Sequence, residues 1–160
     1  MKKRQGLTFI EIVISIFIAA VLLAFLTTTF RTFFAPRLYN AVRRVKSDIE
    51  YTQNLAETTQ IPHSIVFDPS LNRYTVYQGT TTIIPDPVRK KPMIRDFINS
   101  REFQNVDIEL AEFPIGTEHL DFNDDGVPLS GGRVHMAFES ERYEINIEDN
   151  TGNVTIQKLN

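Results

Sequence analysis

The N-terminal sequence MKKRQGLTFIEIVISIFIAAVLLAFLTTTF, residues 1–30, joins a basic hexapeptide to a long apolar run. The hexapeptide carries three cations and no acid, and residues 12–30 contain no charged side chain. Counted back to Leu7, the run reaches the ~20 residues that a helix needs to cross about 30 Å of hydrocarbon. This charge pattern predicts a membrane-spanning helix, with its cationic end in the cytoplasm and the rest of the chain outside it.

Two other interpretations fit this run less well. A helix in the core of a soluble domain normally has a polar stripe, but Ser15 is the only polar side chain between Ile12 and Leu26. A secretory signal ends in a cleavage site of small residues, and the sequence TTTFR that follows Leu26 offers none. We therefore expect no cleavage by the general signal peptidase.

Glu11 is the only charged residue between Leu7 and Phe30. A carboxylate in hydrocarbon costs about 3 kcal/mol on insertion scales, so it should have a partner. In the uncut chain, the side chain can remain in the headgroup layer beside the basic residues. Cleavage between Gly6 and Leu7 would create an α-ammonium about one helical turn from Glu11. This pair, within one chain or between neighbouring copies, would neutralise both groups and set the register of helices that pack side by side.

A basic leader ending in Gly6, followed by Leu7-Thr8-Phe9-Ile10-Glu11 and an apolar run, resembles the type IV pilin and type II secretion pseudopilin superfamily. The resemblance implies a prepilin peptidase that cleaves between Gly6 and Leu7 and N-methylates Leu7. It also assigns Glu11 to filament assembly. The first mature residue of this superfamily is usually Phe, so Leu7 is a departure that bears on methylation more than on cleavage.

Residues 31–58 predict an amphipathic continuation of the helix. Pro36 lacks a backbone N–H, which predicts a kink near residues 32–36. Apolar or small residues then recur at spacings of three and four, and we expect this stripe to pack on the head of the molecule. The stripe consists of Leu38, Val42, Val45, Ile49, Thr52 and Ala56, with Leu55 adjoining it. The charged residues between them are expected to face away: Arg43, Arg44, Lys46, Asp48, Glu50 and Glu57.

Residues 59–160 show the two-residue period of β-strands. Two strands, Ser64–Phe67 and Arg73–Tyr77, flank a hairpin turn at Asp68–Asn72, and a loop rich in proline and charge follows at residues 85–92. Short strands separated by Gly and Asn turns favour an antiparallel sandwich of two small sheets. The fold class is therefore α+β, a long N-terminal helix packed on an antiparallel β-sandwich head, which the resemblance makes pilin-like. Further strands are expected at Val106–Phe113, His119–Phe122, Arg133–Glu139, Arg142–Glu148 and Asn153–Lys158.

The order of the head resembles the GspH/FimT-type minor pseudopilins, through the helix at 48–56, Phe122–Gly126, Gly131–Arg133 and the closing turn at Asn150–Asn153. This resemblance implies a non-enzymatic minor pseudopilin at or near the tip of a type II secretion pseudopilus, where it helps to start assembly. A minor type IV pilin involved in pilus assembly or DNA uptake is one alternative. A membrane-anchored binding domain that never polymerises is another.

The resemblance also implies a location and a set of partners. Residues 1–6 would be the leader, residues 7–30 the transmembrane and filament-core half of the helix, and residues 31–58 its amphipathic half. The β-rich head, residues 59–160, would lie in the periplasm, with the single span in the inner membrane. The partners would be the prepilin peptidase, other major and minor pilins or pseudopilins, and the inner-membrane assembly platform.

The sequence predicts no catalytic residue, no cofactor and no metal site. The absence of cysteine excludes disulfides, thiolate zinc sites and Cys nucleophiles, and no Ser lies in a nucleophile motif. The three histidines, His63, His119 and His135, stand alone in the sequence. Residues 123–126, Asn-Asp-Asp-Gly, have the oxygen density of a calcium loop, but they lack the downstream acid of an EF-hand, so a turn is the favoured interpretation.

One basic cluster lies outside the helix, in and after the proline-rich loop: Arg89, Lys90 and Lys91, with Arg95 and Arg101. One interpretation is contact with nucleic acid. The formal net charge of −3 and the pI near 5.6 argue against polyanion binding by the chain as a whole. We favour a solvated loop that faces acidic neighbours in a subunit interface, and we expect no nucleic-acid partner.

Overall fold

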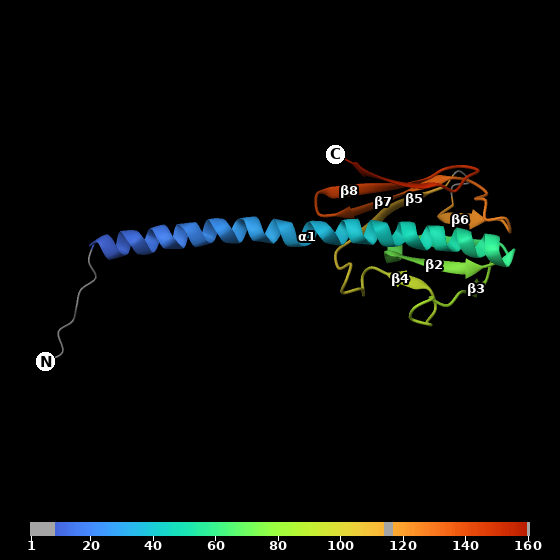
Figure 1. The fold of residues 1–160 in the computed structure, drawn as a ribbon, viewed down its shortest axis with the longest axis horizontal. Helices are drawn as coiled ribbons and strands as arrows, with labels where there is room; N and C mark the ends of the chain where they lie inside the picture. Colours follow the sequence, from blue (N-terminus) through green and yellow to red (C-terminus); the bar gives the residue numbers. More distant parts are fainter. Residues whose placement is uncertain (1–8, 114–116, 160) are drawn as a thin grey trace. The chain divides into compact units, whose positions relative to one another are not determined.

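The computed structural model describes residues 9–113 and 117–159, without the side chains of residues 25–36. The helix α1 spans Phe9–Thr59, and nine β-strands follow it (Figure 1). The chain divides into two compact units, Met1–Pro36 and Arg37–Asn160, which we describe separately. The predicted cleavage site at Gly6 and Leu7 lies outside the described residues. The strands are β1 His63–Asp68, β2 Arg73–Gln78, β3 Thr82–Ile83, β4 Ile94–Asp96, β5 Asp107–Glu112, β6 His119–Phe122, β7 Gly132–Phe138, β8 Glu141–Ile147 and β9 Val154–Leu159.

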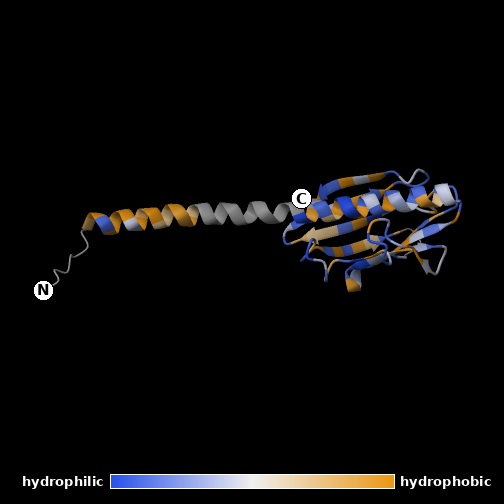
Figure 2. Cartoon of the chain, turned by 60° about the horizontal axis from the view of Figure 1, so that its bottom comes forward, coloured by the Kyte–Doolittle hydropathy of each residue, from blue (hydrophilic) through white to orange (hydrophobic). Residues whose placement is uncertain are grey.

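In the first unit, α1 exposes large apolar side chains around its whole circumference. Phe9 is 83% exposed, Ile16 65% and Phe17 69%, and the hydropathy colouring of this stretch is mostly orange (Figure 2). The Ser15 hydroxyl donates to the Glu11 carbonyl oxygen at 2.7 Å, so the helix itself satisfies this polar group. Within the described part of the chain, no helix has an apolar stretch long enough to cross a membrane. The helix is assigned through Pro36, and the kink expected near it stays a prediction.

In the second unit, the predicted stripe of α1 is the buried face of the helix. All six of its members, from Leu38 to Ala56, have no solvent exposure, as the spacing of three and four requires. This stretch of α1 mixes blue and orange in Figure 2, unlike the first. One prediction is wrong: Asp48, expected to face away, is only 4% exposed. Its position three residues after Val45 and four before Thr52 places it on the buried face.

The head contains two antiparallel sheets, which confirms the predicted fold class. The first sheet has the order β3-β2-β1-β6, with β4 also paired to β2, and the second has the order β5-β7-β8-β9. Seven strands match the predicted ones to within a residue or two at each end. The short strands β3 and β4 were not predicted, because two or three residues in a proline-rich segment carry no readable alternation. They form because β2 offers them a free edge, as in the pairing of Tyr74 with Arg95.

The predicted turn at Asp68–Asn72 is present and also joins the two sheets. Asp68 accepts from the Leu71 backbone N–H at 3.0 Å, and Asn72 adopts a left-handed conformation with φ of 46°. The buried Asn72 amide donates to the Val106 carbonyl at 2.8 Å and accepts from the Ile108 N–H at 2.9 Å. The side chain of Asn72, in the turn between β1 and β2, thereby completes the hydrogen bonding of the backbone at the start of β5.

The second half of α1 contacts both sheets. The Tyr74 hydroxyl on β2 donates to Asp48 at 2.8 Å, and Lys46 Nζ donates to the Val154 carbonyl on β9 at 2.5 Å. Gln53 Nε2 donates to the Thr151 carbonyl at 3.0 Å. The helix and the two sheets therefore enclose one core. Its largest fully buried side chains include Phe67, Tyr74, Phe97, Phe113, Phe122, Leu38, Ile49, Met93 and Met136.

Gly126 and Gly79 provide a test of how tightly α1 packs on the loops of the head. Both have positive φ, 74° and 62°, so alanine strains the backbone at either position. A Cβ at Gly126 would lie 2.9 Å from the Gln53 carbonyl oxygen, whereas a Cβ at Gly79 would meet nothing within 4 Å. We predict that Gly79→Ala lowers the free energy of unfolding by about 1 kcal/mol. Gly126→Ala should lower it by about 3 kcal/mol, because overpacking adds to the strain.

Urea unfolding of the full-length chain in a mild detergent measures both changes. Equal losses in the two variants would show that the helix does not press on the 123–126 turn.

Candidate functional site

Glu11 lies in the first described turns of α1, among exposed apolar side chains. Its neighbours Ile10 and Ile12 are 62% and 47% exposed. A carboxylate in the first turn of a helix is stabilised by the N–H groups that have no partner within the helix. Leu7 lies outside the described residues, so the pairing of Glu11 with its α-amine stays a prediction.

The head contains a second site of polar residues, which we call the charged site: Arg44, Asp48, Tyr74, Asp86 and Arg95. Arg44 and Asp48 come from α1, Tyr74 from β2, Arg95 from β4, and Asp86 from the loop before β4. Tyr74 and Arg95 are partners in the pairing of β2 with β4, so their side chains project from the same face of the sheet. That face is the one that α1 covers, because both side chains contact Asp48.

Arg95 joins the two buried carboxylates of the charged site. Its Nε lies 2.7 Å from Asp48 Oδ2, and its Nη1 lies 2.5 Å from Asp86 Oδ2. The side chains of Arg95, Asp48 and Asp86 are 10%, 6% and 2% exposed. Arg44 adds longer contacts, 3.3 Å to Asp48 and 3.8 Å to Asp86. The charges are thus paired out of water, which is the condition for burying them.

The environment fixes the protonation states of this site. Burial raises the pKa of Asp86, but the Arg89 backbone N–H and the Arg95 guanidinium outweigh it and lower that pKa to about 2. Burial lowers the pKa of Arg95, and its bonds to Asp48 and Asp86 raise it above its ordinary value. Burial, followed by the nearby Asp48 charge, raises the pKa of Tyr74 well above its ordinary value. The site therefore holds ionised Asp86 and Arg95 beside a neutral tyrosine, which suits it to positioning the helix.

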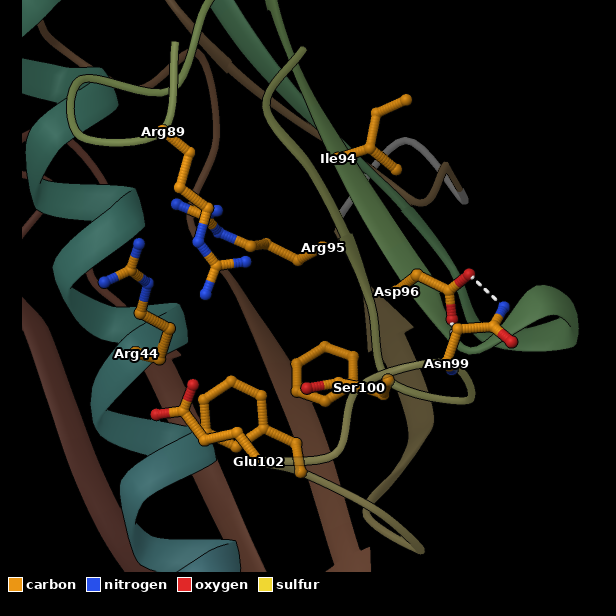
Figure 3. Close-up of a pocket in the computed structure, with 10 residues that line it drawn as sticks. Arg44, Arg89, Ile94, Arg95, Asp96, Asn99, Ser100 and Glu102 are labelled. Carbon is orange, nitrogen blue, oxygen red and sulfur yellow. Dashed lines mark hydrogen bonds between the residues drawn. The ribbon is translucent and has the colours of Figure 1, made fainter. Parts of the chain in front are cut away.

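A pocket of about 250 Å³ opens beside the charged site (Figure 3). Arg44, Arg89 and Arg95 point toward one another across its wall, from the helix, the loop and β4. Its lining residues are Arg44, Arg89, Ile94, Arg95, Asp96, Phe97, Asn99, Ser100, Glu102 and Phe103.

The predicted basic cluster is only partly a surface feature. Arg89, Lys90 and Lys91 are exposed, as expected of a solvated loop. Arg95 is a correction, because its side chain is only 10% exposed and is paired with two carboxylates of the charged site. Arg101 is exposed but is not among the residues that line the pocket.

The histidines and the Asn-Asp-Asp-Gly turn show why isolated polar residues predict little. His135 does not stand alone, since its Nε2 lies 2.8 Å from Glu144 Oε2 on the paired strand β8. Asn123 Oδ1 accepts from the backbone N–H groups of Asp125 and Val127 at 3.1 and 2.8 Å, which makes residues 123–127 a hydrogen-bonded turn. Among the described residues, no group of three or more acidic, His or Cys side chains could hold a metal ion.

The sequence pattern alone does not indicate that Asp48, Tyr74 or Asp86 belongs to a site. A signal was present for Asp48, whose spacing from Val45 and Thr52 fits the buried stripe. Asp86, in a sequence of alternating proline and polar residues, gave no such signal. Its role depends on where the loop folds back, and that position is set by tertiary contacts.

Comparison with known proteins agrees with the N-terminal pattern and the fold. Residues 1–27 match the prokaryotic N-terminal methylation motif, which indicates a membrane-anchored pilin. Two crystal structures of the type IV minor pilin FimU of Pseudomonas aeruginosa have similar folds. The first has a TM-score of 0.55 and 13% sequence identity, and the match covers 77% of this chain and 90% of the FimU chain. The second has a TM-score of 0.52 and 14% sequence identity, and the match covers 75% of this chain and 92% of the FimU chain. At these identities the likeness is one of fold. No curated protein matches the chain.

The lowered pKa of Asp86 predicts a pH dependence of stability. The folded pKa of about 2 lies below the ordinary value of 3.8, so the ionised form stabilises the fold above about pH 4. This contribution, about 2 kcal/mol, should be lost as the pH falls from about 4 to 2. Asp86→Asn should lower the free energy of unfolding at pH 7 by at least that amount and flatten its slope between pH 4 and 2.

Urea unfolding at a series of pH values measures both effects. Asp124→Asn, at an exposed carboxylate of the same head, is the control and should leave the slope unchanged. An unchanged slope in Asp86→Asn would contradict the assignment.

Proposed function

We propose that this chain is a minor structural subunit of a pilin-like filament. Its N-terminal motif and its fold place it in the type IV pilin-like superfamily. The observation that carries the proposal is the methylation motif over residues 1–27. This motif contains Glu11 and the exposed apolar side chains of α1 from Phe9 to Leu23. A helix that is apolar on all sides needs cover from lipid or from other helices.

The first step in this proposal is processing by a prepilin peptidase. Hydrolysis of the bond between Gly6 and Leu7 removes the basic leader and frees the Leu7 amine. N-methylation then replaces one proton of this amine with a methyl group that a methyl-donor cosubstrate of the enzyme supplies. The new cation pairs with Glu11 of the same chain or of a neighbour, and the apolar surfaces of adjacent helices then pack in a fixed register.

Anchoring in the inner membrane precedes assembly. The basic leader would remain in the cytoplasm, and the head would lie in the periplasm. Moving from the bilayer into a filament exchanges one apolar environment for another, so the apolar side chains from Phe9 to Leu23 remain covered in both states.

Two machines use subunits of this kind. The order of elements in the head favours a type II secretion pseudopilus, with the subunit at or near its tip. The fold of FimU, a type IV minor pilin, supports the alternative of a minor type IV pilin involved in pilus assembly or DNA uptake. Deleting the gene separates them: loss of protein export with normal pili supports the secretion system, and loss of pili with normal export supports the pilus.

Processing is tested by the intact mass of the protein extracted from membranes. We predict a chain that begins at Leu7, with or without one added methyl group. An intact Met1 terminus would reject pilin processing and would support the third possibility, an anchored binding domain that does not polymerise. Gly6→Ala should reduce cleavage, because it changes the residue at the predicted cut.

Glu11→Ala should block incorporation into filaments without unfolding the head, because α1 then lacks the carboxylate that pairs with the Leu7 amine. Incorporation is measured by the amount of the subunit in sheared filaments relative to the membrane fraction. Glu50→Ala, at an exposed carboxylate of the head half of α1, is the matched control and should incorporate normally. Normal incorporation of Glu11→Ala would contradict the pairing.

A further inference from the structure

The loop between β3 and β4, residues 85–92, is held in one shape by its own hydrogen bonds; we call it the cationic loop. Pro85 and Pro92 face each other as an antiparallel bridge, and the Asp86 N–H donates to the Lys91 carbonyl at 2.7 Å. Asp86 Oδ1 accepts from the N–H groups of Val88 and Arg89 at 2.8 and 2.7 Å. Lys90 has a φ of 55°, a conformation that a lysine adopts only where such contacts hold it.

The buried base of the cationic loop fixes an exposed tip. Asp86 is 1% exposed and pairs with Arg95, while Val88 at the tip is 81% exposed. Arg89, Lys90 and Lys91 beside it are exposed as well. A partner that binds this tip would meet groups that are already ordered, so less conformational entropy is lost on binding.

Arg89 carries positive charge that the described residues leave unpaired. Arg95 forms ion pairs with Asp48 and Asp86, and Arg44 makes longer contacts with the same carboxylates. Arg89 forms no ion pair with another described residue, and its guanidinium points into the pocket beside the other two (Figure 3). Guanidinium groups bind carboxylates through two parallel N–H bonds, so this arrangement suits an incoming carboxylate.

We propose that the cationic loop and the pocket beside it bind an acidic segment of a neighbouring protein subunit, with a partner carboxylate on Arg89. The inference rests on the proposed function for the presence of a neighbouring subunit. Lys90 and Lys91 would add longer-range attraction, and Val88 would add an apolar contact at the edge of the interface.

One feature of the pocket favours a protein partner over nucleic acid. The lining rings of Phe97 and Phe103 are 1% and 8% exposed, so they offer no face on which a base can stack. The site therefore lacks the stacking surface that nucleic-acid binding uses, while Arg89 still offers a carboxylate its paired N–H donors.

Binding of labelled probes to the purified full-length chain, measured by fluorescence anisotropy in neutral detergent, tests this proposal. The probes are a hexaglutamate peptide and a single-stranded oligonucleotide of equal charge. We expect the peptide to bind more tightly than the oligonucleotide, and we expect the affinity for the peptide to fall as salt is added. Arg89→Gln should weaken peptide binding about tenfold, which is the loss expected for one charge-assisted hydrogen-bonded pair. Arg89→Lys keeps the charge but lacks the planar guanidinium, so its affinity for the peptide should lie between those of the unchanged chain and Arg89→Gln.

Arg101→Gln is the matched control, because it removes the same charge from an exposed arginine outside the pocket. It should change peptide binding by less than about twofold, as surface charges outside a contact do. Equal losses in the Arg89 and Arg101 variants would overturn the proposal in favour of a diffuse surface potential. Tighter binding of the oligonucleotide would overturn it in favour of nucleic acid, and no peptide binding would overturn it outright.

The outcome is separable from that of the proposed function. A chain cut after Gly6 that does not bind hexaglutamate overturns this inference alone. A chain that keeps Met1 but binds the peptide through Arg89 overturns the filament proposal and leaves the acidic-segment site standing.

Discussion

The guanidinium of Arg95, held between Asp48 and Asp86, is the interaction on which the arrangement of the head depends. It joins the helix to two neighbouring segments that are distant from it in the sequence, the edge strand β4 and the loop that precedes this strand. Buried ion pairs contribute little net stability relative to an apolar core, but breaking one partner from them is costly. This interaction therefore restricts where the helix can lie on the first sheet more than it strengthens the fold.

The apolar stripe of α1 supplies the stability that the ion pairs do not. Side chains from Leu38 to Ala56 lose all contact with water on packing, and each large one contributes about 1.5 to 3 kcal/mol. Apolar contacts have no direction, so the stripe alone would tolerate small shifts of the helix along the sheets. The bonds of Asp48, Lys46 and Gln53 to the two sheets and the 149–152 turn remove that freedom.

The two halves of α1 show one secondary structure serving two environments. The half in the head carries a narrow apolar stripe and charged residues on its other faces, so its partner is within the chain. Between Phe9 and Leu26 this half carries only Glu11 and Ser15 as polar side chains, and its large apolar side chains as far as Leu23 are exposed. The boundary between the compact units falls between Pro36 and Arg37, where one pattern gives way to the other. This division fits the proposed function, in which the apolar half would join a common filament and the head would give the subunit its own place there.

Local sequence patterns predict the long helix, its buried stripe, the α+β class and the N-terminal motif, because each depends on residues close together in the chain. Contacts between distant segments place Asp86 and Tyr74 in one site with Arg95 and bring His135 against Glu144. Those contacts need the register of β4 on β2 and of β7 on β8, which no local pattern encodes. A charged residue looks the same in the sequence whether water or a buried carboxylate is its partner, and only the folding of distant segments onto one another distinguishes the two.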